Sequence, residues 1–106
     1  MTTNDFIRQY KNSGQFNYHQ MEEIRGGFAQ GLTIDQVKVY AKPEFNSCQM
    51  DAIRQGFKMG LLIEQVKLYA KPEFDWQRMW EIRDFIKENN NLPINTIKFL
   101  IGLNCI

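Results

Sequence analysis

The feature that most constrains this chain is a 29-residue unit that occurs twice in nearly the same form and a third time in part. The first copy covers residues 16–44 and the second residues 45–73, and nineteen of the twenty-nine positions are identical. A third copy begins at Phe74, on the same spacing, and diverges in its second half. Self-similarity at this period is typical of repeat proteins, in which each unit buries its apolar face against its neighbours.

The first half of each unit predicts an amphipathic helix. Met21, Ile24 and Phe28 recur at the spacing i, i+3, i+7, which places them on one helical face. A short polar residue that can accept a hydrogen bond from a backbone N–H stands before each stripe, at the position of an N-cap. These cap residues are Asn17, Asn46 and Asp75.

The second half of each unit predicts a shorter helix. Gly31 and Gly60 follow the first helix and are expected in the left-handed conformation that ends helices, and Asn89 stands in the same register. The second helix is expected over residues 33–41 and 62–70, where a Lys-Pro pair ends it.

Glycine in the middle of a helix costs roughly 1 kcal/mol of stability relative to alanine, and Gly27 and Gly56 both lie mid-helix. We expect that glycine is needed there because a neighbouring helix approaches closely. Phe85 occupies this register in the third copy. Phe45, before the cap of the second unit, is expected to be buried between units.

The expected fold class is all-α, with about seven short helices stacked as a small solenoid or bundle in a single domain. An N-terminal helix over residues 3–11, capped by Thr3 or Asn4, resembles half a unit. The expected organisation is residues 1–15 as an N-terminal half-repeat cap, 16–44 and 45–73 as units one and two, and 74–106 as unit three with a C-terminal cap.

Composition argues against several classes of function. The net charge of +1 lacks the basic footprint of a strong nucleic-acid binder. No apolar run reaches the 18 residues of a membrane span, so no membrane association is expected. His19 is the lone histidine, and Cys48 and Cys105 fit no metal spacing. We expect a cytoplasmic protein with reduced cysteines and no catalytic residue, cofactor or metal.

A motif spans the junction of the first two units and resembles a known type of repeat. It reads YAxPxF, then Met, Ile-Arg and Gly at fixed intervals, and comprises Tyr40, Ala41, Pro43, Phe45, Met50, Ile53, Arg54 and Gly56. The pattern is similar to tandem helical repeats in proteins of intestinal Firmicutes, their mobile elements and phages. The resemblance implies a phage or mobile-element protein in a bacterial host cell, a context in which inhibitors of host defence, including anti-CRISPR proteins, are common. It implies no activity.

An arginine follows the core isoleucine of each unit, at Arg25, Arg54 and Arg83. These arginines could contact phosphates or an acidic partner. The interpretation we favour is structural, with each arginine capping helix carbonyls or pairing with Glu44 or Glu73.

A helix-turn-helix is an alternative, because residues 30–37 resemble the first helix of that motif. The helix that starts after Asn46 would then enter the major groove with Cys48, Gln49 and Ala52 foremost. That helix has few side chains suited to reading bases, so a DNA-binding regulator is the second hypothesis.

The outward face of the first helices is the predicted partner-binding surface. In the third unit this face carries two tryptophans one turn apart, where the second unit has polar residues. Exposed aromatic side chains of this kind anchor protein interfaces. The predicted surface consists of Tyr18, Glu22, Asp51, Trp76 and Trp80.

The tryptophans have a second interpretation. Trp76 and Trp80 could instead cover the apolar C-terminal tail, through Leu103 and Ile106. With both alternatives open, the sequence predicts a non-enzymatic helical-repeat module that binds a protein, with an inhibitor of a bacterial defence complex as its sharpest form.

Overall fold

The computed structural model describes residues 1–103, and that part of the chain contains helices and no strand. The prediction of an all-α fold with about seven helices is confirmed. The helices are α1 (Thr3–Asn12), α2 (Tyr18–Gln30), α3 (Ile34–Tyr40), α4 (Ser47–Lys58), α5 (Ile63–Val66), α6 (Trp76–Glu88) and α7 (Ile94–Gly102).

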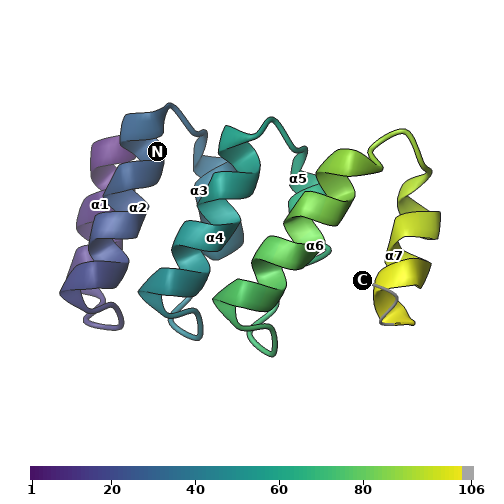
Figure 1. The fold of residues 1–106 in the computed structure, drawn as a ribbon. Coiled ribbons are helices and arrows are strands. Elements are labelled where there is room, and N and C mark those ends of the chain that lie inside the picture. The colour runs from purple at the N-terminus through teal and green to yellow at the C-terminus, as the bar shows by residue number, and fades with distance from the viewer. Residues whose placement is uncertain (104–106) are drawn as a thin grey trace.

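The helices form two layers (Figure 1). The layer in front holds α2, α4 and α6 side by side, and α2 contacts α4 as α4 contacts α6. The shorter helices α1, α3 and α5 lie behind them, and α7 stands at the far end. Each 29-residue unit thus supplies its long first helix to the front layer, which carries the predicted binding surface.

The predicted N-caps of the three long helices are confirmed. The side-chain oxygens of Asn17 and Asn46 each accept the N–H of the glutamine three residues on, at 2.8 Å, and Asp75 accepts that of Arg78 at 2.7 Å. The N-terminal helix is capped by Thr2 rather than by Thr3 or Asn4. The Oγ1 atom of Thr2 accepts the N–H of Asp5 at 3.1 Å.

Two of the three predicted left-handed helix ends are confirmed. Gly31 and Gly60 have φ of 99° and 90°. The prediction for Asn89 is wrong, because its φ is −121°. The Phe85 carbonyl accepts both the backbone N–H of Asn89, at 3.0 Å, and its side-chain amide, at 2.9 Å. The helix thus ends on hydrogen bonds from Asn89 without a left-handed residue.

The second helices are shorter than predicted, most of all in the second unit, where α5 has four residues. In the first unit Thr33 caps α3 and accepts the N–H of Gln36 at 3.2 Å. Leu62 holds the equivalent position in the second unit and has no side-chain acceptor. After Val66 the chain continues in tighter turns with hydrogen bonds between residues three apart. The Tyr69 N–H, for example, donates to the Val66 carbonyl at 3.1 Å.

A buried glutamine joins each of the first two units to the next. The Gln20 Nε2 donates to the carbonyls of Pro43 and Phe45, at 3.2 and 2.7 Å. Gln49 repeats these bonds one unit later, at 3.1 and 2.7 Å, to Pro72 and Phe74. Both glutamines are 6% exposed. Each side chain caps its own helix through Oε1 and holds the start of the next unit through Nε2.

The mid-helix glycines are explained by a tyrosine from the second half of the same unit. A Cβ on Gly27 would overlap the Tyr40 hydroxyl, and a Cβ on Gly56 would overlap that of Tyr69. The Tyr40 hydroxyl donates to the Glu23 carbonyl of α2 at 2.7 Å. Burial raises the pKa of both phenols, so they remain protonated donors.

The third unit has other residues at both of these positions. Phe85 stands where the first two units have glycine, and Leu100 stands where they have the tyrosine. Unit three therefore has no tyrosine hydroxyl for which a glycine would have to leave room.

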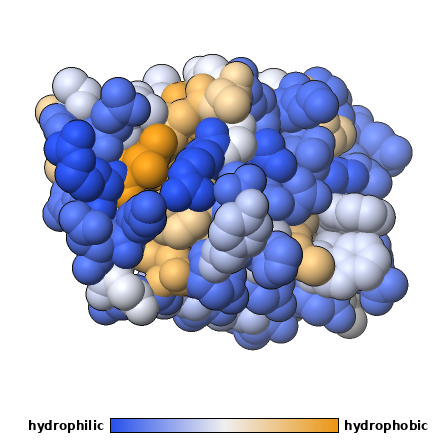
Figure 2. Space-filling view, turned by 90° about the vertical axis from the view of Figure 1, so that its left-hand side faces the viewer, coloured by the Kyte–Doolittle hydropathy of each residue, from blue (hydrophilic) through white to orange (hydrophobic). Residues whose placement is uncertain are grey.

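The N-terminal helix α1 packs on one end of the stack through its aromatic residues. Phe6 of α1 is fully buried and stacks on Tyr10, with ring centroids 4.0 Å apart. It also meets the edge of Phe28 of α2, at 5.4 Å. Figure 2, which looks onto this end, shows apolar side chains gathered in a band between polar ones. The N-terminal helix thus covers the end of the stack in part.

The glutamine bonds between units can be tested with Gln49→Glu. The variant keeps the Oε1 acceptor that caps α4 but removes both donors to the carbonyls of the following loop. We expect the free energy of unfolding to fall by about 1–3 kcal/mol, because two part-buried carbonyl acceptors, on Pro72 and Phe74, lose their partners. Urea denaturation followed by circular dichroism measures the change.

Gln65→Glu is the matched control. Gln65 also accepts the N–H of its cap residue, Leu62, at 2.8 Å, and donates no hydrogen bond to another unit within residues 1–103. We expect it to change stability by less than about 1 kcal/mol. Equal losses in both variants would contradict the inter-unit role of Gln49.

Candidate protein interaction surface

Two tryptophans lie exposed on the front layer, at the N-terminal half of α6. Trp76 is 36% and Trp80 is 42% exposed, although tryptophan is usually among the more buried residues. Their ring centroids are 4.8 Å apart and their planes meet at 73°, an edge-to-face pair. The pair forms a preorganised aromatic surface rather than two independent side chains.

The tryptophans line a hollow between the long helices, which we call the tryptophan hollow. Its volume is about 300 Å³. The lining residues come from all three units: Glu23 from α2, Cys48 and Asp51 from α4, and Trp76 and Trp80 from α6. It lies on the α4 side of α6, because its other lining side chains come from α4 and α2.

The structure brings together three of the five residues predicted for the partner surface: Asp51, Trp76 and Trp80. Tyr18 and Glu22 do not line the hollow. Tyr18 is 70% exposed on α2, where its ring meets the edge of His19. Two residues that sequence reasoning did not include, Glu23 and Cys48, complete the lining.

Arg54 organises the acidic side of the hollow. Its guanidinium lies 2.9 Å from the Glu23 carboxylate and 3.1 Å from that of Asp51, so it bridges the first two units. Gly26 leaves room for it, since a Cβ there would lie 2.9 Å from an Arg54 nitrogen. Burial raises the pKa of the Glu23 carboxyl above its usual value, and Arg54 opposes that shift.

The other two arginines also have carboxylate partners, but not the ones predicted. Arg25 pairs with Glu22 at 3.1 Å, and Arg83 pairs with Asp84 at 3.0 Å. The Arg83 guanidinium also lies 5.6 Å from the ring centroid of Trp80, a cation–π contact. The pairing predicted with Glu44 or Glu73 is therefore wrong, because the arginines lie on the front layer and find acidic residues there.

The sequence contains one partial signal for Glu23, its position next to a core residue. Glu23 precedes the buried Ile24, and Arg54 follows the buried Ile53. Because α2 and α4 pack side by side, residues next to these core positions meet between the helices. Cys48 carries no such signal, since it is exposed and stands in the register of His19.

The helix-turn-helix hypothesis is contradicted at two of its three proposed base-reading residues. Gln49 is 6% exposed and Ala52 is fully buried, both within the stack. Only Cys48 is exposed. If α4 entered a major groove, Gln49 and Ala52 would therefore not reach the bases.

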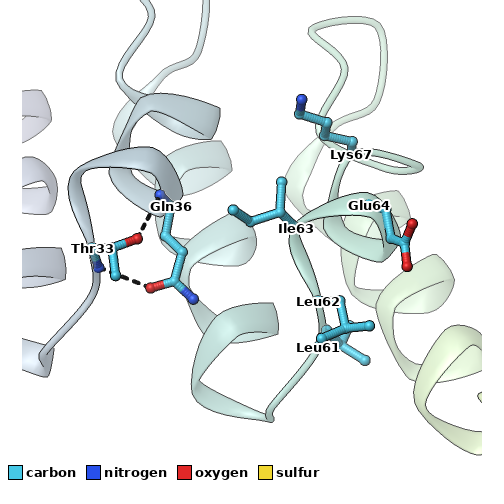
Figure 3. A pocket seen from close by; sticks show the side chains of 7 residues that line it. All are labelled: Thr33, Gln36, Leu61, Leu62, Ile63, Glu64 and Lys67. Atoms are coloured by element: carbon cyan, nitrogen blue, oxygen red, sulfur yellow. Dashed lines mark hydrogen bonds between the residues drawn. The ribbon is translucent and has the colours of Figure 1, made fainter.

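A larger hollow of about 650 Å³ lies at the edge where the first and second helices of the first two units connect, and we call it the loop-edge hollow. Figure 3 shows Leu62 and Ile63 opposite the capping pair of Thr33 and Gln36. Leu62 is 59% exposed, an apolar side chain at a position suited to a polar cap. The lining residues are Thr33, Gln36, Leu61, Leu62, Ile63, Glu64 and Lys67.

Residues 1–103 offer neither a metal site nor a membrane span. No group of three or more His, Cys, Asp or Glu side chains there could hold a metal ion. No helix in that range has the length and apolar character needed to cross a membrane. Of the tail residues proposed to lie under the tryptophans, Leu103 is 55% exposed. Ile106, like Cys105, lies outside the described residues.

The missing cap at Leu62 gives a stability prediction. Leu62→Thr restores the acceptor that Thr33 supplies in the first unit, and little apolar burial is lost. We expect the free energy of unfolding to rise by about 1 kcal/mol. Thermal and urea denaturation measure it, and Thr33→Leu, the reverse change in the first unit, should lower stability by a similar amount. A destabilised Leu62→Thr would show that Leu62 packs more than its exposure indicates.

Comparisons with protein-family models, with curated proteins and with solved structures find no match. The resemblance to the repeats of mobile-element and phage proteins therefore stays a prediction from the motif.

Proposed function

We propose that this chain is a non-enzymatic module that binds a protein partner through the front layer, with Trp76 and Trp80 at the centre of the contact. The observation that carries the proposal is the exposure of both tryptophans at positions where the second unit has Ser47 and Asp51. A stacked repeat does not need aromatic side chains at these positions, because the second unit stacks without them.

Physical chemistry of interfaces supports this assignment. Tryptophan is enriched among the residues that dominate binding energy, especially beside a depression that a partner side chain can fill. The tryptophan hollow supplies such a depression, and the edge-to-face contact holds both rings in place. Less side-chain entropy is then lost on binding than for mobile side chains.

A sharper form of the proposal concerns the partner. The repeat motif resembles proteins of phages and mobile elements, and on that support alone we propose a component of a bacterial defence complex, bound in the host cytoplasm. Expression in a host with an active defence system, followed by phage plating, tests it. Unchanged plating efficiency across the defence systems of that host would contradict this form and leave the protein-binding proposal standing.

The tryptophan surface is tested by the double variant Trp76→Ala, Trp80→Ala. The wild-type chain, immobilised as bait in host lysate, yields a partner that is then purified for measurement of Kd. We expect at least about 30-fold weaker binding by the double variant, corresponding to ~2 kcal/mol. The circular dichroism spectrum and melting temperature should stay close to wild type, because both rings are exposed.

Phe99→Ala is the matched control, because Phe99 is 65% exposed on α7, away from the hollow. It should bind as the wild type does. A sharp fall in melting temperature of the double variant would favour the alternative role, in which the tryptophans cover the C-terminal tail. Wild-type affinity in the double variant would refute the proposed surface.

A further inference from the structure

We propose that the tryptophan hollow binds one basic side chain of the partner, an arginine or a lysine, between the aromatic rings and the carboxylates of Glu23 and Asp51. This inference rests on the proposed function, and it adds the chemistry of the group that enters the surface. Two independent features of the hollow, its aromatic wall and its charge, favour a cation over other ligands.

The aromatic wall favours a cation because the face of an indole is electron-rich. Tryptophan is the best aromatic partner for ammonium and guanidinium groups, which bind within about 6 Å of the ring centroid. Trp80 already makes one such contact, with Arg83 at 5.6 Å. The contact shows that a guanidinium can lie against the Trp80 indole, and Trp76 supplies a second indole beside it.

The acidic wall favours a cation because its charge is not balanced. Glu23 and Asp51 supply two negative charges, and Arg54, which pairs with both, supplies one positive charge. The lining carboxylates and Arg54 together carry one net negative charge, which one basic side chain neutralises. Arg83 does not contribute a second positive charge, because its guanidinium is paired with Asp84 at 3.0 Å.

Acceptor atoms remain for the incoming group. Arg54 binds Glu23 through Oε2 and Asp51 through Oδ1, and Gln55 shares that Oδ1 at 3.4 Å. Within residues 1–103, Glu23 Oε1 and Asp51 Oδ2 accept no hydrogen bond. A guanidinium can donate two parallel hydrogen bonds to carboxylate oxygens, so arginine suits these acceptors better than lysine does.

The size of the hollow agrees with a single side chain. Its volume of about 300 Å³ is at the lower limit of pockets that hold drug-sized ligands. An anionic side chain would meet the unbalanced carboxylates, and a purely apolar one would leave them facing an apolar group at a desolvation cost.

The indole signals provide a test that needs no partner. The chain has two tryptophans, both in the hollow, so the two indole Nε1–H peaks of a ¹H–¹⁵N NMR spectrum report on this site. The full chain is titrated with Nα-acetyl-arginine methylamide and Nα-acetyl-lysine methylamide. The neutral isostere Nα-acetyl-citrulline methylamide is titrated in parallel. We expect saturable shifts of both indole peaks with at least one cationic probe and none with citrulline.

Asp51→Asn tests the acidic wall, and Glu22→Gln is its matched control, because Glu22 has the same register in the first unit and does not line the hollow. We expect about fivefold weaker probe binding in Asp51→Asn and wild-type binding in Glu22→Gln. If Asp51→Asn is unfolded by circular dichroism, Glu23→Gln replaces it with the same expectation.

The inference is overturned if citrulline shifts the indole peaks as the cations do, if neither cation shifts them, or if removing the carboxylate leaves probe affinity unchanged. Each of these results can occur while the double tryptophan variant still loses its partner. Failure of the cation site is therefore distinguishable from failure of the proposed function.

Discussion

The stack depends on a buried side-chain amide that completes hydrogen bonds in two units at once. Gln20 accepts the N–H of its own cap residue and donates to two carbonyls of the loop that leads into the second unit. The bond to the Phe45 carbonyl is buried, where an unpaired acceptor is costly. Because Gln49 makes the same bonds one unit later, the spacing between consecutive long helices is set by the same geometry twice.

The sequence predicted those features whose cause lies within a few residues. The caps Asn17 and Asn46, the left-handed Gly31 and Gly60, and the apolar stripes follow from local rules. The left-handed conformation predicted for Asn89 was wrong, because an asparagine can also end a helix through hydrogen bonds of its side chain. The local pattern permits both solutions, and the tertiary context selects one.

Features that depend on contact between units could be predicted only in part. The periodicity placed Asp51, Trp76 and Trp80 on one face, and they do line one hollow. It did not reveal that Glu23 joins them or that Arg54 bridges the carboxylates, since the lateral offset between α2 and α4 is set by packing rather than by the repeat. The hydrogen bonds that Gln20 donates to the start of the second unit could not be predicted for the same reason.

The reach of the glutamine bonds also shapes how the chain folds. Each of them joins residues 23 or 25 positions apart, so two consecutive units can associate without waiting for distant parts of the chain to meet. Chains with mostly local contacts have low contact order and form their native topology quickly. Each unit contacts chiefly its neighbours, so structure can nucleate at the junction of the first two units and extend from there. Loss of structure is then expected to start at an end of the stack and to move inward, with the junction held by Gln20 opening last.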